Sequence, residues 1–144
     1  MNTETYNQAL KYLSLRAHTV FELRQKLLKK KFSKPEIQEV LDELMKMKYL
    51  NDEDFASVFV HNLVKYKSFG YYGIKAKLMQ RGIANDISEK VLGEELSLEQ
   101  ERKIADKAVS KSSKTDAMKL AQMLQRKGFR SQVISEVVKG IDQD

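Results

Sequence analysis

The chain has 144 residues, of which 42% are hydrophobic, and it contains one proline, six glycines and no cysteine. Without cysteine there are no disulfides, no thiolate nucleophile and no cysteine-based metal site, and no stretch approaches the roughly 18 apolar residues of a membrane-spanning helix. The N-terminal residues also lack the basic-then-apolar order of a secretory signal, so we expect a cytoplasmic protein.

The positive charge is concentrated toward the two ends of the chain. The net charge is +6, which permits a nucleic-acid partner without requiring one. Residues 1–50 carry ten Lys and Arg against six Asp and Glu, a net +4, and residues 98–144 carry ten against seven, a net +3. Residues 51–97 carry six against seven, a net −1, so the middle is nearly neutral.

Helical spacing of apolar residues continues along the whole sequence, which predicts an all-α fold. In chain order we expect helices at 4–15, 19–30, 34–47, 52–67, 71–81, 86–95, 97–110, 115–127 and 131–141. Capping residues mark four of the starts, namely Thr19 with Glu22, Ser33 with Glu36, Asn51, and Asp86.

One pattern of apolar residues recurs three times in these helices. It ends at Phe32 in the first copy, at Ile83 in the second and at Phe129 in the third, each time five residues after a leucine. Another helix precedes and a further helix follows each copy, which predicts three tandem three-helix repeats over residues 1–50, 51–96 and 97–144. A single unit of this size buries little core, so we expect the units to stack into an elongated, curved array.

The residue before the last apolar position of each copy closes a helix. In two copies it is a glycine, Gly82 or Gly128, which adopts the required left-handed conformation without a steric cost. Lys31 stands at the equivalent place in the first copy, and we expect it to close its helix either less favourably or in a different way.

The second helix of each unit ends in positive charge, and this has two interpretations. Cations suit a helix C-terminus through the macrodipole, and charged faces are usually only solvated. Alternatively, equivalent cations in stacked units form a basic stripe that binds phosphates or acidic side chains. The candidate partner-binding or DNA-binding residues of this stripe are Arg16, Arg24, Lys26, Lys30, Lys67, Lys75, Lys77, Arg81, Arg126 and Lys127.

Other candidate sites have simpler explanations. Residues 65–73 mix aromatics, lysines and glycines, which either stack on single-stranded bases or form a kinked connection in which Gly70 and Gly73 let two helices approach closely. The acidic run that begins at Asp52 suits helix capping better than cation binding. His18 and His61 do not have zinc-ligand spacing, and the sequence indicates no catalytic residue, metal site or cofactor.

Four segments in order give a family resemblance that covers about residues 7–140. The stretch from Ala9 to Leu23, the stretch from Tyr49 to Ala56, the stretch from Gly70 to Ile83, and Lys127-Gly128-Phe129 resemble the signatures of the RecX regulatory proteins of bacteria. The chain departs from that pattern at Lys31, where family members usually carry glycine.

The resemblance implies a function that composition does not supply. It implies a non-enzymatic negative regulator that binds the RecA–single-stranded-DNA filament and inhibits its growth, ATPase and strand exchange. The implied partner is the RecA filament, with single-stranded DNA as a further partner and neither a membrane nor a small-molecule substrate.

Two rivals remain open at this point. One is a helical DNA-binding module that acts without RecA, since three-helix units also occur in helix-turn-helix proteins. Its difficulty is the acidic character of the third helices, which carry Glu36, Glu39, Asp42, Glu43, Glu89, Glu94, Glu95 and Glu136. The other rival is a helical-repeat adaptor for a different protein.

Overall fold

A computed structural model describes residues 1–142, and this part of the chain is entirely helical. Its helices are α1 (Thr3–Leu15), α2 (Val20–Lys29), α3 (Lys34–Lys46), α4 (Asp52–Tyr66), α5 (Tyr71–Gln80), α6 (Asn85–Glu95), α7 (Leu98–Lys111), α8 (Ala117–Arg126) and α9 (Ser131–Asp142). The predicted all-α fold is confirmed, and every predicted helix end lies within two residues of the observed one.

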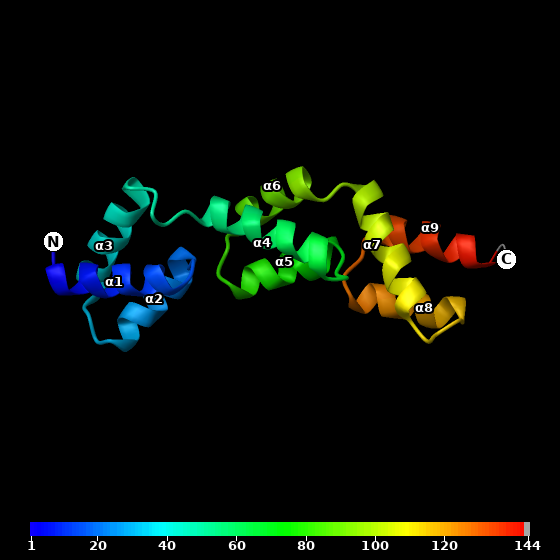
Figure 1. The fold of residues 1–144 in the computed structure, drawn as a ribbon, viewed down its shortest axis with the longest axis horizontal. Helices are drawn as coiled ribbons and strands as arrows, with labels where there is room; N and C mark the ends of the chain where they lie inside the picture. The colour runs from blue at the N-terminus through cyan, green and yellow to red at the C-terminus, as the bar shows by residue number, and fades with distance from the viewer. Residues whose placement is uncertain (143–144) are drawn as a thin grey trace.

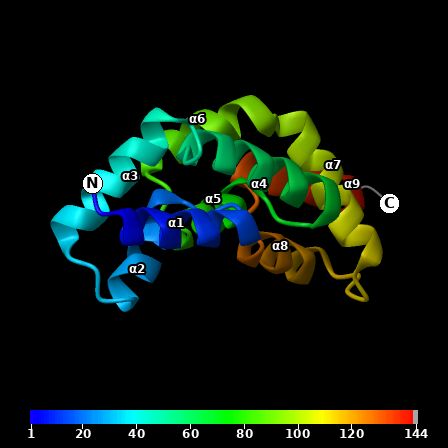
Figure 2. The same cartoon turned by 60° about the vertical axis from the view of Figure 1, so that its left-hand side comes forward.

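The helices form three tandem units of three. Each helix packs chiefly on the other two of its own triple, α1–α3, α4–α6 or α7–α9. The units follow one another along an elongated body with the two termini at opposite ends, and the second helices α2, α5 and α8 lie along one edge (Figure 1). A view from another side shows that the array is curved, with α3, α6 and α7 along its outer side (Figure 2). The exact limits of the repeats, 1–50, 51–96 and 97–144, stay a prediction.

The buried apolar residues form two separate cores. One core belongs to the first unit and is built around Leu23, Leu27 and Leu41. The other is continuous through the second and third units, from Ala56 in α4 to Val137 in α9. The second and third units therefore share apolar surface as expected for stacked repeats, whereas the first unit has a core of its own.

Three of the four expected caps are present. Thr19 with Glu22 and Ser33 with Glu36 form complete capping boxes, and the Asn51 side chain accepts from the N–H of Asp54. The prediction for Asp86 was wrong, because α6 begins one residue earlier, after Ala84, and no side chain caps it. Asp86 lies in the first turn, where its charge still suits the positive end of the helix dipole.

The second helices meet end to end at the junctions between units. At the second junction, the N–H of Gly70 donates to the carbonyl of Lys127 at 3.0 Å, and that of Tyr72 donates to the carbonyl of Gly128 at 2.8 Å. A Cβ atom on Gly73 would lie 2.3 Å from the carbonyl oxygen of Lys127. Because Gly70 and Gly73 have no side chains, the C-terminal end of α8 in the third unit packs directly against the start of α5. The expectation that these glycines bring α4 and α5 together was wrong.

Three equivalent residues close the second helices in the left-handed conformation, at φ 71° for Lys31, 82° for Gly82 and 80° for Gly128. A side chain with a Cβ atom is strained there, by roughly 1–2 kcal/mol. The unfavourable closure expected at Lys31 is therefore confirmed.

We expect Lys31→Gly to raise the free energy of unfolding by about 1 kcal/mol, because glycine relieves the left-handed strain. The matched control is Lys29→Gly, which places glycine within α2 and should lower stability by about 0.5–1 kcal/mol. Urea unfolding followed by circular dichroism measures both, and a Lys31→Gly protein no more stable than the parent contradicts the strain argument.

We expect Gly128→Ala to lower the free energy of unfolding by about 3 kcal/mol or more, from left-handed strain together with overpacking. A Cβ atom there would lie 2.0 Å from the backbone nitrogen of Gly73. Gly93, in α6, would have no atom within 4 Å of its Cβ, so Gly93→Ala should raise stability by about 0.5–1 kcal/mol. Thermal melts of the two variants should therefore shift in opposite directions.

Candidate binding surface

The predicted stripe residues lie mainly on the edge formed by the second helices. Five of them lie within second helices, namely Arg24 and Lys26 in α2, Lys75 and Lys77 in α5, and Arg126 in α8. The other five are C-terminal caps, namely Arg16 of α1, Lys30 of α2, Lys67 of α4, Arg81 of α5 and Lys127 of α8. Because α2, α5 and α8 follow one another along one side of the array (Figure 1), the cations are distributed over its length. Their role in binding stays a prediction.

At the first junction the structure brings two of these cations to one carboxylate. The Glu22 side chain lies 2.9 Å from the guanidinium of Arg81 and 3.4 Å from that of Arg16. Burial opposes ionisation of Glu22, but hydrogen bonds from the Thr19 N–H and from Arg81 outweigh it and lower the pKa of Glu22. Arg81 therefore joins the second unit to the first, and Arg16 pairs with Glu22 inside the first unit, so both cations are less free to meet a partner.

The guanidinium of Arg81 is also fixed by aromatic rings. Its central carbon lies 5.7 Å from the centre of the Phe55 ring and 5.4 Å from that of Phe59, within cation–π range. The Thr19 hydroxyl donates to the carbonyl of Arg81, so backbone and side chain of this residue both face the first junction.

At the second junction two lysines share one aromatic ring. The ammonium of Lys77 lies 4.4 Å from the centre of the Phe69 ring, and that of Lys127 lies 5.6 Å from it. Lys127 also lines a small depression with Lys111, Ser68 and Ser112. Lys77 of the second unit and Lys127 of the third thus meet at one ring, and Phe69 is half-buried beneath them as a kinked connection requires.

The remaining cations are separate from one another. Arg24 donates to Gln38 at 3.4 Å and Lys75 pairs with Glu89 at 3.0 Å, each within its own unit. Lys30, Lys67 and Arg126 are exposed and form no ion pair with the described residues. These three are the cations most available to a phosphate or an acidic side chain.

His18 is buried at the first junction, with 3% of its surface exposed. Its Nε2 atom lies 2.8 Å from the ammonium of Lys26, which can only donate, so Nε2 accepts and the proton is on Nδ1, 2.9 Å from the carbonyl of Arg16. Burial, and then the nearby positive charges of Arg16 and Lys26, lower the pKa of His18, while the hydrogen bond to the Arg16 carbonyl and the charge of Glu22 oppose the shift. Burial and the contact with the Lys26 ammonium therefore favour the neutral imidazole.

Glu101 is a buried residue at the second junction that the sequence did not reveal. Its carboxylate, in the first turn of α7, is fully buried and accepts from the N–H of Tyr71 at 3.0 Å and from the N–H of Arg130 at 2.8 Å. The Arg130 guanidinium donates to the same carboxylate and to the carbonyl of Leu96. The position of Glu101 three residues before Ile104, on the apolar face of α7, is the signal that could have revealed its burial.

The same three-helix units occur in a known family. Residues 6–44 match the pattern described as RecX, first three-helix domain, and residues 51–92 match RecX, second three-helix domain. "Regulatory protein RecX" of Bacillus subtilis is 34% identical over 95% of this chain and 54% of its own length, and that of Chlorobium limicola is 31% identical over 90% and 84%. The chain belongs to the RecX family.

Solved structures agree with this RecX fold. The crystal structure of RecX from Lactobacillus salivarius superposes with a TM-score of 0.87 over 99% of this chain and 97% of that one, at 24% identity. The chain spans about half the length of the Bacillus and Lactococcus relatives it matches. The relatives from Chlorobium limicola and Trichlorobacter lovleyi are covered over 84% and 94% of their own length, respectively.

Among residues 1–142, His, Asp and Glu side chains form no group of three or more that could hold a metal ion. None of the described helices is long and apolar enough to cross a membrane.

We expect the free energy of unfolding to fall as the pH is lowered from about 7.5 to 5.5, because of His18. Its pKa is lower in the folded state, so the unfolded chain binds more protons in this window and stability is lost as the pH falls through the folded pKa. His18→Phe, which copies Phe69 at the equivalent position, should flatten this dependence. His61→Gln, at an exposed site, should leave it unchanged. Urea unfolding across the window tests this, and an equally steep fall in His18→Phe contradicts it.

Proposed function

We propose that this RecX-family chain is a negative regulator of the RecA recombinase. In this proposal it binds the RecA–single-stranded-DNA filament in the cytoplasm and inhibits filament growth, ATPase and strand exchange without catalysing a reaction itself. The observation that carries the proposal is family membership, since the matched relatives are named regulatory proteins.

The shape and charge of the array support this proposal. An elongated, curved body with cations along one edge (Figure 1) suits a long partner that presents repeated phosphates or carboxylates. The stripe acts in this proposal through electrostatic contact with RecA acidic residues or with the bound strand. The most exposed contacts are Lys30, Lys67 and Arg126, one from each unit.

The two rival functions have less support. A DNA-binding module needs a recognition helix, and the third helices present exposed carboxylates, among them Glu39, Asp42 and Glu89, that would repel phosphate. A general adaptor has no specific observation in its favour. Tight binding to duplex DNA in the absence of RecA would favour the first rival, and capture of a partner other than RecA would favour the second.

We expect the triple variant Lys30→Glu, Lys67→Glu and Arg126→Glu to require about tenfold more protein to inhibit RecA, because it loses electrostatic contacts with the filament. The measurement is RecA ATPase on single-stranded DNA as the variant is titrated. These three side chains form no ion pair with the described residues, so their reversal should leave the fold intact.

The matched control reverses Lys11, Lys46 and Lys107, which are exposed on first and third helices. Each replacement of a Lys or Arg by Glu lowers the net charge by two, so both triple variants have a net charge of zero instead of +6. Inhibition by the stripe variant that equals inhibition by the control would contradict the stripe, whereas no inhibition by the parent protein would contradict the proposed function.

A further inference from the structure

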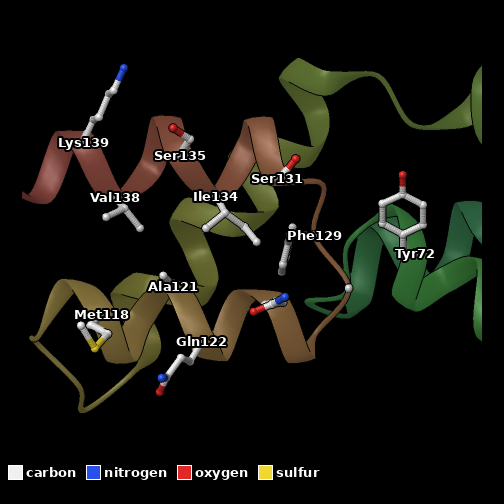
Figure 3. A pocket seen from close by; sticks show the side chains of 12 residues that line it. Tyr72, Met118, Ala121, Gln122, Phe129, Ser131, Ile134, Ser135, Val138 and Lys139 are labelled. Atoms are coloured by element: carbon white, nitrogen blue, oxygen red, sulfur yellow. The ribbon is translucent and has the colours of Figure 1, made fainter.

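An open groove runs between α8 and α9 in the third unit. It has a volume of about 700 Å³ and is bounded by one face of each helix, with Tyr72 of α5 at one end. Figure 3 shows Ala121 and Gln122 on one side and Ile134, Ser135 and Val138 on the other, with Phe129 at the base.

The groove is open because a polar bridge found in the other two units is missing. The copies of the repeat are offset by 51 residues and then by 46, as Phe32, Ile83 and Phe129 show. The Arg24–Gln38 hydrogen bond of the first unit therefore corresponds to the Lys75–Glu89 ion pair of the second. Each spans the second and third helices of its unit. The corresponding residues of the third unit are Ala121 and Ser135, whose side chains are too short to meet.

The floor of the groove is apolar. Met118 at one end is 71% exposed and Phe129 at the base is 3% exposed. Ile134 and Val138 are only half-buried, whereas the residues equivalent to Val138, Leu41 and Leu92, are fully buried. Apolar surface in a groove between two helices is the usual seat of an amphipathic helix.

The described charged side chains around the groove are positive. Lys139 lines it on α9, and Arg126 lies beside Gln122 and Gln125 in an adjoining depression on α8. Among the side chains that the structure describes, no carboxylate lines it, because Glu136 pairs with Arg102 of α7 and Asp116 caps the start of α8. The groove is thus complementary to a ligand with apolar and acidic side chains.

We propose that the groove between α8 and α9 is a docking site for an amphipathic helix of a protein partner that carries acidic residues beside its apolar face. Apolar side chains of that helix bind over Phe129, Ile134 and Val138, and its carboxylates meet Lys139 and Arg126. This inference goes beyond the proposed regulation of RecA and does not depend on it.

The test uses a fluorescein-labelled helical peptide with leucines along one face and glutamates elsewhere, measured by fluorescence anisotropy with the full chain. The double variant Ala121→Arg with Ser135→Gln rebuilds the bridge of the first unit and should raise Kd at least tenfold. The added arginine would by itself favour an acidic peptide, so weaker binding reports closure of the groove. Lys139→Glu should also weaken binding, and Lys11→Glu, an equal charge change at an exposed site on α1, should leave it unchanged.

Thermal melts establish that each variant is folded before binding is compared. The proposal is overturned if the bridged variant binds as tightly as the parent, or if the parent binds no peptide. It is also overturned if a peptide with lysines in place of the glutamates binds equally well, since charge complementarity then plays no part. Sedimentation in which the parent self-associates and the bridged variant stays monomeric would assign the groove to a second copy of this chain instead.

Discussion

The buried carboxylate of Glu101 joins three elements of the array. It accepts from the first N–H of α5, from the backbone N–H of Arg130 and from the Arg130 guanidinium. A buried carboxylate is costly unless it is paired and hydrogen-bonded, and here both conditions are met. The helix α5 also depends on it, because its N-cap is Gly70, which has no side chain to cap the helix. Glu101 thereby fixes the second unit to the third. The close backbone approach that Gly128 permits acts at the same junction.

At the first junction a different set of contacts joins the first unit to the second. There Asp52, in the first turn of α4, accepts from the first N–H of α2, and the ends of α2 and α5 are joined by Thr19 and by the Glu22–Arg81 pair. The apolar core is not continuous across this junction, whereas it is continuous across the second. Nearest-neighbour contacts determine the cooperativity of a repeat protein, so the second and third units form the more strongly coupled pair.

The sequence predicted those features that local physical rules determine. Helical periodicity identified every described helix, and the equivalence of Lys31 with Gly82 and Gly128 marked it as the unusual closing residue, although it did not predict its left-handed conformation. The junctions could not be predicted in this way, because Glu101 has the composition of an ordinary first-turn acid and only tertiary packing buries it. The groove was missed for a related reason. Ala121 is unremarkable until the bridges at the equivalent positions of the other units are seen.

The role of a repeat position therefore depends on its neighbours as well as on its residue type. Lys30, Arg81 and Lys127 occupy equivalent C-terminal caps, where a cation suits the helix dipole in every copy. Arg81 and Lys127 each contact the preceding unit, through Glu22 and Phe69 respectively. Lys30 has no preceding unit in the described structure and is exposed. A cation that binds a neighbouring repeat is less available to a partner, so the ten stripe residues should differ in their effect on binding, with the exposed, unpaired ones dominating.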